Sequence, residues 1–486
     1  MNNPRESANG NQERAAQILR QELPELAVFS YDERERLLAS LQQEIIIGLN
    51  RIRQSRPPTE ADSGLPAVPY PVDRPKRLEL YQCPPQSVLA CICGGQEWRA
   101  TILHWDGRNW HEEKAVENQR TIPENQRVFR GDRAVADFID LMAGLAGGSL
   151  ARFGRPALIK AMAVSFGFPQ GNEKVGYGIE AFFKTEILPK HWLVEGGIGV
   201  RLGHLLLGEL QHRGYSNLQR TVIANDTIST ALDITAGDEP AEIAKANSGA
   251  RKNGDLGKYE RVLPLGVVIG SGANIAMEYL GRLVNLEIGE ASSLGIDPIL
   301  ARMHKLGLTP KGQHGPTLEY YFSGNYQLPR LVGALSLLAD RGLCDARIVD
   351  RFLEIVRSGK NEAKILDRLI TGEMTSESLN QYLSFEVKPA DFSIVKETAR
   401  LVMAKAVEVA ALMISSVLLT GNWHKGEIPV VGSVFWKAKV GPEGEVFGDQ
   451  VMKLVNAWVG GDLKAVKADE LRGLAGLDLI QVKQDF

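Results

Sequence analysis

The sequence has few cysteines and none of the spacings that bind a structural metal. Four of its 486 residues are cysteine, and three of these, Cys83, Cys91 and Cys93, fall in one short segment without a second pair or nearby histidines. Structural zinc sites take four ligands, usually from two close pairs, and the eight histidines form no HExxH motif. We therefore expect buried thiols on a strand and no metal site made from protein ligands.

The sequence also lacks an excess of either charge and lacks a long uninterrupted apolar run. It has 56 lysines and arginines against 59 aspartates and glutamates, so no basic field is available for nucleic acid or an anionic membrane. The polar N-terminus has no apolar signal-peptide core, and the most apolar stretch, 407–419, contains Glu408 and is short for a membrane span. These absences predict a cytoplasmic protein that binds neither nucleic acid nor membrane.

What is present is the composition of a globular protein with more than one core. Hydrophobic residues make up 44% and charged residues 24%, which is ordinary for a globular chain. A length of 486 residues is large for a single hydrophobic core, so two lobes are expected.

The N-terminal part combines a predicted helix with an extended connector. The first ten residues are polar, and we expect them to be frayed. Ser30 and Glu33 form a capping box, and apolar residues then recur at helical spacing: Leu37, Leu38, Leu41, Ile45 and Leu49. Prolines recur from 57 to 75, which excludes a helix or a central strand and predicts an extended connector.

The rest of the chain alternates between strand and helix patterns. A hairpin turn at Asp106-Gly107 follows two strand-like segments, and the period then changes to helical from Arg133. We expect strands at 87–93, 98–105, 161–166, 219–224, 262–269 and 427–437, a helix at 199–213, and almost continuous helix from 328 to 420. A hairpin followed by mixed α/β structure, twice over, favours an α/β protein with two lobes.

Two glycine-rich turns and one polar triplet follow predicted strands. Glycines at 94–95 and 270–272 would let backbone amides approach a phosphate, although glycine after a strand is also typical of an ordinary tight turn. Asp226, in Asn225-Asp226-Thr227, stands at a strand end where it could accept a proton from a substrate hydroxyl. Most such triplets, however, form an Asx-turn or a helix N-cap.

Six segments resemble, in order and at similar intervals, the motifs of the hexokinase family. The family motifs are Phe-Ser-Phe-Pro, Trp-Thr-Lys-Gly, Asn-Asp-Thr-Val-Gly-Thr, Gly-Thr-Gly-Thr-Asn, Asn-Thr-Glu-Trp-Gly, and Phe-Glu-Lys with Ser-Gly-Met-Tyr. The matching segments are 165–170, 182–185, 225–230, 270–274, 285–289, and 318–319 with 323–326. The resemblance implies an α/β, two-lobed actin-like ATPase (ribonuclease H-like) fold with an interlobe cleft. It implies an N-terminal segment (1–75) packed on the large lobe, a small lobe (76–224) and a large lobe (225–486).

The resemblance also implies roles for individual residues. Asp226 would be the general base, acting on the 6-hydroxyl of a hexose. The sugar-binding residues would be Gly167, Phe168, Pro169, Lys184, Asn225, Asn274, Glu287 and Glu319. The nucleotide-binding residues, which would take ATP with Mg²⁺ as a substrate complex, would be Gly94, Gly95, Arg99, Thr227, Gly270, Ser271, Gly272, Gly432 and Ser433.

The sequence departs from the family on both sides of this site. On the sugar side, Gly167 replaces a serine, Phe183 a threonine and Pro316 a glutamine. On the nucleotide side, an acid is replaced by Ile92, a Thr-Asn pair by Gln96-Glu97, and a second acid by Val431. The family's terminal glycine-rich motif and its helix are expected to be absent, so that the chain ends in a short tail after 477–479.

Three functions are compatible with these departures. The first is a hexokinase-type enzyme of carbohydrate phosphorylation that transfers the terminal phosphoryl group of ATP to a hexose such as glucose. The second is a hexose-binding pseudokinase that acts as a sensor or scaffold. The third is a kinase that uses another phosphoryl donor, such as ADP or polyphosphate.

Overall fold

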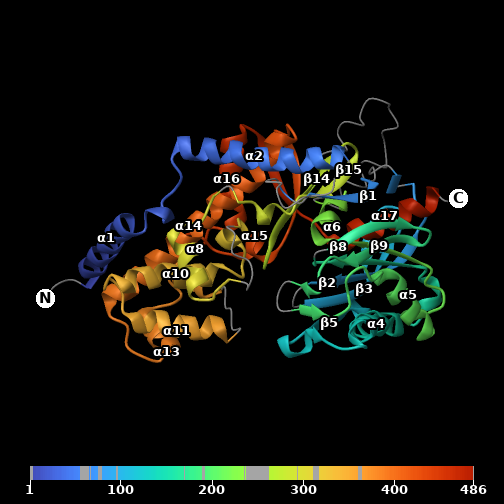
Figure 1. Ribbon diagram of the computed structural model, residues 1–486, viewed down its shortest axis with the longest axis horizontal. Coiled ribbons are helices and arrows are strands. Elements are labelled where there is room, and N and C mark those ends of the chain that lie inside the picture. Colours follow the sequence, from blue (N-terminus) through green and yellow to red (C-terminus); the bar gives the residue numbers. More distant parts are fainter. Residues whose placement is uncertain are drawn as a thin grey trace.

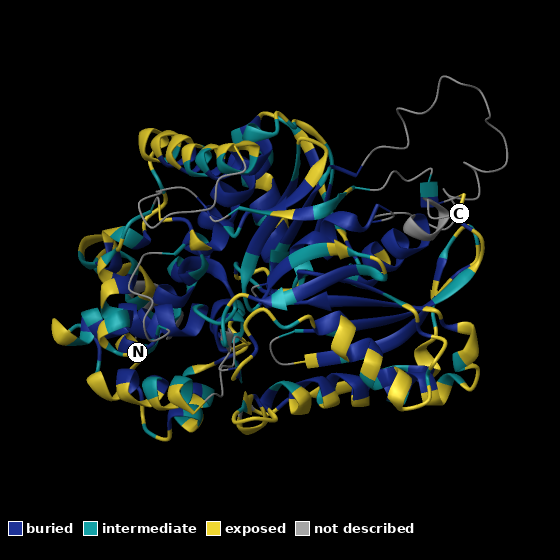
Figure 2. Cartoon of the chain, turned by 45° about the vertical axis from the view of Figure 1, so that its right-hand side comes forward, coloured by how far each residue is buried: buried dark blue, intermediate teal, exposed yellow. Residues whose placement is uncertain are grey.

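The computed structural model describes residues 4–54, 65, 67–74, 79–80, 82–94, 97–168, 170–188, 192–234, 236, 262–292, 294–309, 317–358 and 364–484. The chain forms two lobes, each built on its own β-sheet (Figure 1). The strands of both sheets are mainly buried, whereas the outward faces of the surrounding helices are exposed (Figure 2).

The first lobe contains an eight-stranded sheet in the order β4-β3-β2-β7-β12-β9-β8, with β5 paired to β3. Its strands are β2 Gln86–Cys93, β3 Glu97–Trp105, β4 Trp110–Glu112, β5 Asn118–Thr121, β7 Ala161–Phe166, β8 Gln170–Val175, β9 Gly178–Phe183 and β12 Arg220–Ala224. Helices α4 (Ala134–Phe153) and α5 (Leu202–His212) pack on it, and a small sheet is formed by β6 (Val128–Phe129), β10 (Ile187–Leu188) and β11 (Trp192–Val194). Strands β2, β3, β7 and β12 lie within a residue of the expected bounds, and α4 begins where the period changes, but α5 begins three residues later than expected and the other strands of this lobe were not given bounds from the sequence.

The second lobe contains a six-stranded sheet in the order β1-β15-β14-β13-β16-β17. Its strands are β1 Val68–Asp73, β13 Leu265–Ile269, β14 Ala273–Tyr279, β15 Arg282–Asn285, β16 Lys425–Val431 and β17 Asp462–Lys467. Its helices are α8 Pro298–Lys305, α9 Glu319–Phe322, α10 Gln327–Asp340, α11 Ala346–Arg357, α12 Lys364–Thr371, α13 Ser376–Leu383, α14 Pro389–Thr420, α15 Ser433–Lys437 and α16 Phe447–Val459. The strand expected over 427–437 is therefore too long. It ends at Val431, because Gly432, with a φ of 115°, turns the backbone into α15.

The two sheets share one topology. In the first lobe β2 pairs antiparallel with β3 and parallel with β7, which is parallel to β12. In the second lobe β13 pairs antiparallel with β14 and parallel with β16, which is parallel to β17. An antiparallel start followed by parallel strands, repeated in both lobes, confirms the predicted two-lobed α/β architecture.

The N-terminal helices α1 (Pro4–Glu22) and α2 (Tyr31–Arg53) pack on α14 of the second lobe. Ser30 caps α2 by accepting a hydrogen bond from the Glu33 amide at 3.2 Å, as the capping box predicts. The expectation of ten frayed residues is wrong, because α1 begins at Pro4. By length and composition α4 and α14 could each span a membrane, but 89% of the most apolar window of α14 is buried inside the protein, as in a core helix.

Two short connections tie the lobes together through helices α6 (Asp226–Leu232) and α17 (Glu470–Gln484). Each follows the last parallel strand of one sheet, and the two helices pack against each other. The expectation that the terminal helix is absent is wrong. Gly473 and Gly476 lower the helix propensity of this segment, but an Asp469 cap and the burial of Leu471 and Leu474 stabilise it. Since α17 lies on β2, β7 and β12, the segment 225–486 contributes one helix to the first lobe.

Candidate functional site

Asp226 lies at the junction of β12 and α6, where the first lobe leads into the second. Asn225 is the N-cap of α6, and its Oδ1 accepts a hydrogen bond from the Thr227 amide at 2.9 Å. Asp226 Oδ1 accepts from the same amide at 2.8 Å. A Cβ atom on Gly167 would lie 3.5 Å from Asp226 Oδ2, so the predicted base and the sugar signature adjoin. The triplet does form a helix cap, and this cap orients the predicted base.

Two buried asparagines connect Glu287 to the start of α6. Asn274 Nδ2 donates to Asn285 Oδ1 at 2.7 Å and to Glu287 Oε2 at 3.1 Å, and Asn285 Nδ2 donates to Glu287 Oε1 at 2.6 Å. Thr227 Oγ1 lies 3.3 Å from Asn274 Nδ2. Because buried amides must be hydrogen-bonded, this network fixes the orientation of Glu287. Thr227, predicted to bind nucleotide, is fully buried within the network.

Charges from both lobes interact at Glu287. Burial, together with the negative charges of Glu290 and Asp226, raises the pKa of Glu287 to about 8. Lys184, which follows β9 in the first lobe, interacts electrostatically with both glutamates, and partial desolvation lowers its pKa although the residue is exposed. Partial desolvation also raises the pKa of Glu290, which is itself an exposed residue. Lys184 is thus the positive group that the first lobe presents to the acidic side of the second.

Glu319, at the start of α9, lies close to two glycines beside the same site, Gly272 and Gly289. A Cβ atom on Gly272 would lie 2.9 Å from Glu319 Oε1, and one on Gly289 would lie 3.6 Å from Glu319 Cβ. Gly289 also packs so closely on Ala273 that a Cβ atom would lie 2.4 Å from the Ala273 oxygen. The structure therefore brings the predicted sugar residues Asn225, Asn274, Glu287 and Glu319 together beside Asp226.

The second glycine-rich turn, 270–272, meets two other backbone segments. The Gly324 amide donates to the Gly270 oxygen at 2.7 Å. A Cβ atom on Gly270 would lie 3.5 Å from Gly432 Cα and 3.8 Å from the Ser433 nitrogen. The predicted nucleotide-binding residues Gly270, Gly432 and Ser433 are thus near neighbours, and Ser271 lies in the same turn.

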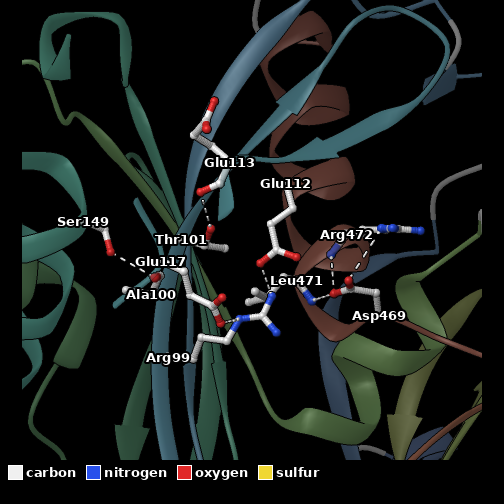
Figure 3. A network of polar contacts seen from close by, with 10 residues as sticks. All are labelled: Arg99, Ala100, Thr101, Glu112, Glu113, Glu117, Ser149, Asp469, Leu471 and Arg472. Atoms are coloured by element: carbon white, nitrogen blue, oxygen red, sulfur yellow. Dashed lines mark hydrogen bonds and ion pairs between the residues drawn. The ribbon is translucent and has the colours of Figure 1, made fainter. Parts of the chain in front are cut away.

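The first glycine-rich turn is followed by an arginine that is already paired. Arg99, on β3, forms ion pairs with Glu112 and, at 3.0 Å, with Glu117 (Figure 3). Gly94 accepts a hydrogen bond from the Trp98 indole at 2.8 Å. The carboxylates of its own lobe therefore compete with any phosphate for the Arg99 guanidinium.

The remaining predicted residues divide into two groups. Phe168 is buried in an aromatic cluster, with its ring centroid 4.8 Å from that of Phe166 and 5.6 Å from that of Trp192, so it supports the site from the core. Gly95 and Pro169, and the substituted position Pro316, lie outside the described residues.

Three residues of the site were not identified from the sequence. Asn285 belongs to a segment that resembles the family, and its place at the end of a buried strand is the signal that could have identified it. Glu290 has no sequence signal, because only the fold brings it to Lys184. Glu470 was overlooked because its helix was expected to be a tail. Among the described residues, no group of three or more histidines, cysteines and acids could hold a metal ion.

Comparison with solved structures identifies the fold, whereas comparison of the sequence with known families and proteins does not. No protein-family model and no curated protein matches the sequence. Among solved structures, a hexokinase from Schistosoma mansoni complexed with glucose superposes with a TM-score of 0.71 at 17% identity, over 97% of this chain and 99% of that one. A second hexokinase crystal structure superposes with a TM-score of 0.70 at 15% identity, over 96% of this chain and all of the other.

Proposed function

We propose, from the hexokinase fold of this chain, that it binds a hexose between its lobes and transfers the terminal phosphoryl group of ATP to the 6-hydroxyl. The observation that carries the proposal is the network of Asn274, Asn285 and Glu287 beside Asp226. Carboxylates and amides with fixed orientations are the groups that bind adjacent sugar hydroxyls in pairs. Burying several polar groups costs free energy. Such a network is therefore expected where its groups bind a polyol substrate.

In the proposed reaction each group has a limited task. Glu287, Glu319, Asn274 and Asn225 hold the ring hydroxyls from the second lobe, and Lys184 bonds a hydroxyl from the first. Asp226 accepts the proton of the 6-hydroxyl as its oxygen bonds to phosphorus and the bond to the leaving oxygen of ADP breaks. Mg²⁺ enters with the nucleotide as part of the substrate, and its phosphates approach the turn at 270–272, in which the Gly270 amide is already bonded to the Gly272 oxygen at 2.8 Å. Closure of the lobes excludes water.

A second function, a hexose sensor without phosphoryl transfer, is favoured by a specific observation on the nucleotide side. Arg99 is paired with Glu112 and Glu117, and the neighbouring strand offers Ile92 instead of an acid. Phosphoryl transfer is accelerated mainly by stabilisation of the charge on the transferring group. A protein with an intact sugar network and weakened phosphate contacts would bind hexose, close and present its closed surface to a partner.

One set of measurements separates these functions. The purified protein is incubated with Mg²⁺, several hexoses and ATP, ADP or polyphosphate, and sugar phosphate is followed. We expect ATP-dependent product that falls by about 10²–10⁴-fold in Asp226→Asn, the range for loss of a general base. Hexose binding by calorimetry without product from any donor would contradict the enzyme and support the sensor. Product from ADP or polyphosphate alone would identify a different donor.

The pairing of Arg99 gives a further test of the nucleotide side. In the double variant Glu112→Gln and Glu117→Gln the guanidinium loses both ion-pair partners. We expect the KM for ATP to fall severalfold, because a charge-assisted contact to phosphate is worth about 1.5–3 kcal/mol. The variant Glu113→Gln, on the same segment, is the control. If the KM is unchanged in the double variant, Arg99 does not contact the nucleotide.

A further inference from the structure

Gln170, the first residue of β8, is buried without a hydrogen-bond partner for its side chain. The residue is 6% exposed, and among the described residues neither its Oε1 nor its Nε2 has a partner. Burial of an unpaired amide is unfavourable, so nearly all such groups in folded proteins bond to protein, water or a ligand. The side chain therefore has a donor and an acceptor available to a molecule that binds beside it.

Two neighbouring polar side chains show that this part of the fold can satisfy such groups. Asn172 lies two residues farther along β8, and its Nδ2 donates to the Ile223 oxygen at 2.9 Å and to the Glu180 oxygen at 3.2 Å. Ser165, at the end of β7, donates to Glu470 Oε2. Of these three polar side chains, that of Gln170 is the one with no bond to the described residues.

The position of Gln170 in the chain brings it to the proposed sugar site. Gln170 is three residues after Gly167, whose Cβ atom would lie 3.5 Å from Asp226 Oδ2. In the β8–β9 hairpin Gln170 pairs with Phe183, the residue before Lys184. Strand β8 also packs against β1 of the second lobe. Gln170 therefore lies at the end of the hairpin that leads to Gly167 and Lys184, on a strand that touches both lobes.

The packing around the hairpin does not require an amide at this position. Residues that pair directly across antiparallel strands share one face, so Gln170 lies on the face of Phe183, whose ring centroid is 5.6 Å from those of Phe138 and Phe166. On the other face, a Cβ atom on Gly171 would lie 2.3 Å from Phe182 Cζ. Since the neighbouring rings are apolar, an apolar side chain would pack here at lower cost than glutamine.

We propose that Gln170 binds the hexose, with Oε1 accepting a hydrogen bond from one ring hydroxyl and Nε2 donating to the adjacent hydroxyl. This inference rests on the proposed function and adds a residue that determines its sugar specificity. Relative to the hexokinase motifs, the first lobe lacks hydroxyl groups at Gly167 and Phe183. Gln170 is three residues from the first position and directly opposite the second. Its planar amide supplies a donor and an acceptor in a fixed geometry, which selects the orientation of two neighbouring hydroxyls.

The first test measures glucose binding by calorimetry in the wild type and in Gln170→Met, which keeps a side chain of similar length without polar hydrogen-bonding groups. We expect the Kd to rise about tenfold, because each lost hydrogen bond weakens binding by about two- to tenfold. Gln86→Met is the matched control, since Gln86 Nε2 is also buried without a partner but lies at the start of β2, far along the strand from Gly94. The control should leave the Kd unchanged. An unchanged Kd in Gln170→Met would overturn the proposal.

The second test identifies the hydroxyls with the 1-, 2-, 3- and 4-deoxy forms of glucose. In the wild type, loss of a hydroxyl that bonds to Gln170 should raise the Kd relative to glucose. In Gln170→Met the same ratio should be smaller by about two- to tenfold for two adjacent positions, because the partner of those hydroxyls is gone. Ratios that are the same in both proteins for every deoxy sugar would show that Gln170 does not contact the hexose.

Urea unfolding separates a ligand contact from a structural role. Without sugar, the midpoint of Gln170→Met should equal or exceed that of the wild type, because the variant removes an amide that the fold leaves unpaired. Saturating glucose should raise the wild-type midpoint more than that of the variant at the same concentration. A lower midpoint without sugar would mean that protein or water already satisfies the amide, and this would contradict the proposal.

Failure of this inference can be distinguished from failure of the proposed function. If no donor yields sugar phosphate but the deoxy-sugar pattern is measured, Gln170 stands as a contact of a hexose sensor and phosphoryl transfer fails. If glucose is phosphorylated and Gln170→Met binds every sugar as the wild type does, the role of Gln170 fails alone. A wild-type protein that binds no hexose would overturn both.

Discussion

At the scale of single residues, the space beside Gly167 shows what the site has lost. The nearest atoms to an added Cβ are Asp226 Oδ2 at 3.5 Å, Gly94 Cα at 3.7 Å and the Cys93 oxygen at 3.8 Å, all ordinary contacts. A serine fits here without displacing its neighbours, so the glycine is not required by packing. We therefore expect the missing hydroxyl to change ligand contacts at the proposed site and not its packing.

The variant Gly167→Ser should therefore bind hexose more tightly. One added hydrogen bond is worth about 0.5–1.5 kcal/mol, so we expect the Kd measured by calorimetry to fall about two- to tenfold. Gly167→Ala adds the same Cβ without the hydroxyl and should leave the Kd unchanged. Equal affinities for the serine and alanine variants would show that position 167 does not contact the sugar.

The raised pKa of Glu287 predicts how stability depends on pH. The folded protein keeps a proton on Glu287 up to a pKa of about 8, while the unfolded chain releases it near about 4.3. The corresponding stability is complete below the lower value and is lost as pH rises through the higher one. Between pH 5 and 9, Glu287→Gln should gain stability relative to the wild type by ~1–2 kcal/mol, since solvent reduces the full effect.

Urea unfolding at four or five pH values would measure this gain. The exposed Glu443→Gln serves as the control and should show a constant difference from the wild type. If the unfolding free energy of Glu287→Gln also differs from that of the wild type by a constant amount across this pH range, the amide network, and not burial, controls the protonation of Glu287.

At the scale of elements, the crossing of α6 and α17 joins the base to the terminal helix. Gly473 stands at the crossing, where a Cβ atom would lie 2.2 Å from the Ser229 oxygen and 2.8 Å from the Asp233 nitrogen. Gly476 faces Leu80, whose nearest atom would lie at 3.6 Å. The close contact between the helices therefore requires a glycine at position 473, whereas the packing around position 476 does not.

We expect Gly473→Ala to destabilise the protein by about 1–3 kcal/mol, the usual result of overpacking, and to disturb Asp226 through α6. Gly476→Ala should be neutral or stabilising by up to about 1 kcal/mol, because alanine favours helix. Urea unfolding measures both variants. Equal effects at the two positions would show that the helices do not cross at Gly473 in solution.

At the scale of the whole molecule, a basic side chain of one lobe faces acidic side chains of the other. Lys184 in the first lobe interacts with Glu287 and Glu290 in the second. A hexose that bonds to both sides would add further contacts between them and favour a closed arrangement, because only the closed state makes all of the contacts.

Small-angle X-ray scattering should therefore show a smaller radius of gyration with saturating glucose than without it. In Lys184→Met this compaction should be reduced or lost, while Lys174→Met, at an exposed position of the same lobe, should behave as the wild type. Compaction that is equal in Lys184→Met and the wild type would exclude the lysine as the group that links the lobes.

The regular elements were predictable because their patterns are local. The cap at Ser30, the strand β3 before its hairpin turn and the helical run of α14 each follow from side chains within one segment. The terminal helix was missed because two glycines oppose it locally, and its stability comes from α6 and the first sheet. Local propensity fails where packing against distant segments contributes more free energy than the segment's own preference.

The sequence by itself determined the mixed α/β order of the first lobe's central strands, the position of Asp226 after a strand, and the carboxylates and amides available at the site. These depend on spacing along the chain. Only the tertiary structure decided which groups meet: Asn285 with Glu287, Glu290 with Lys184, and Glu470 with the strand ends beside Asp226. Asn285 and Glu287 lie close together in the sequence, whereas Lys184 and Glu290 lie in different lobes, and Ser165, the strand-end residue that contacts Glu470, is 305 residues away from it. The two distant contacts are set by the pairing of strands and the crossing of helices, which no local pattern encodes.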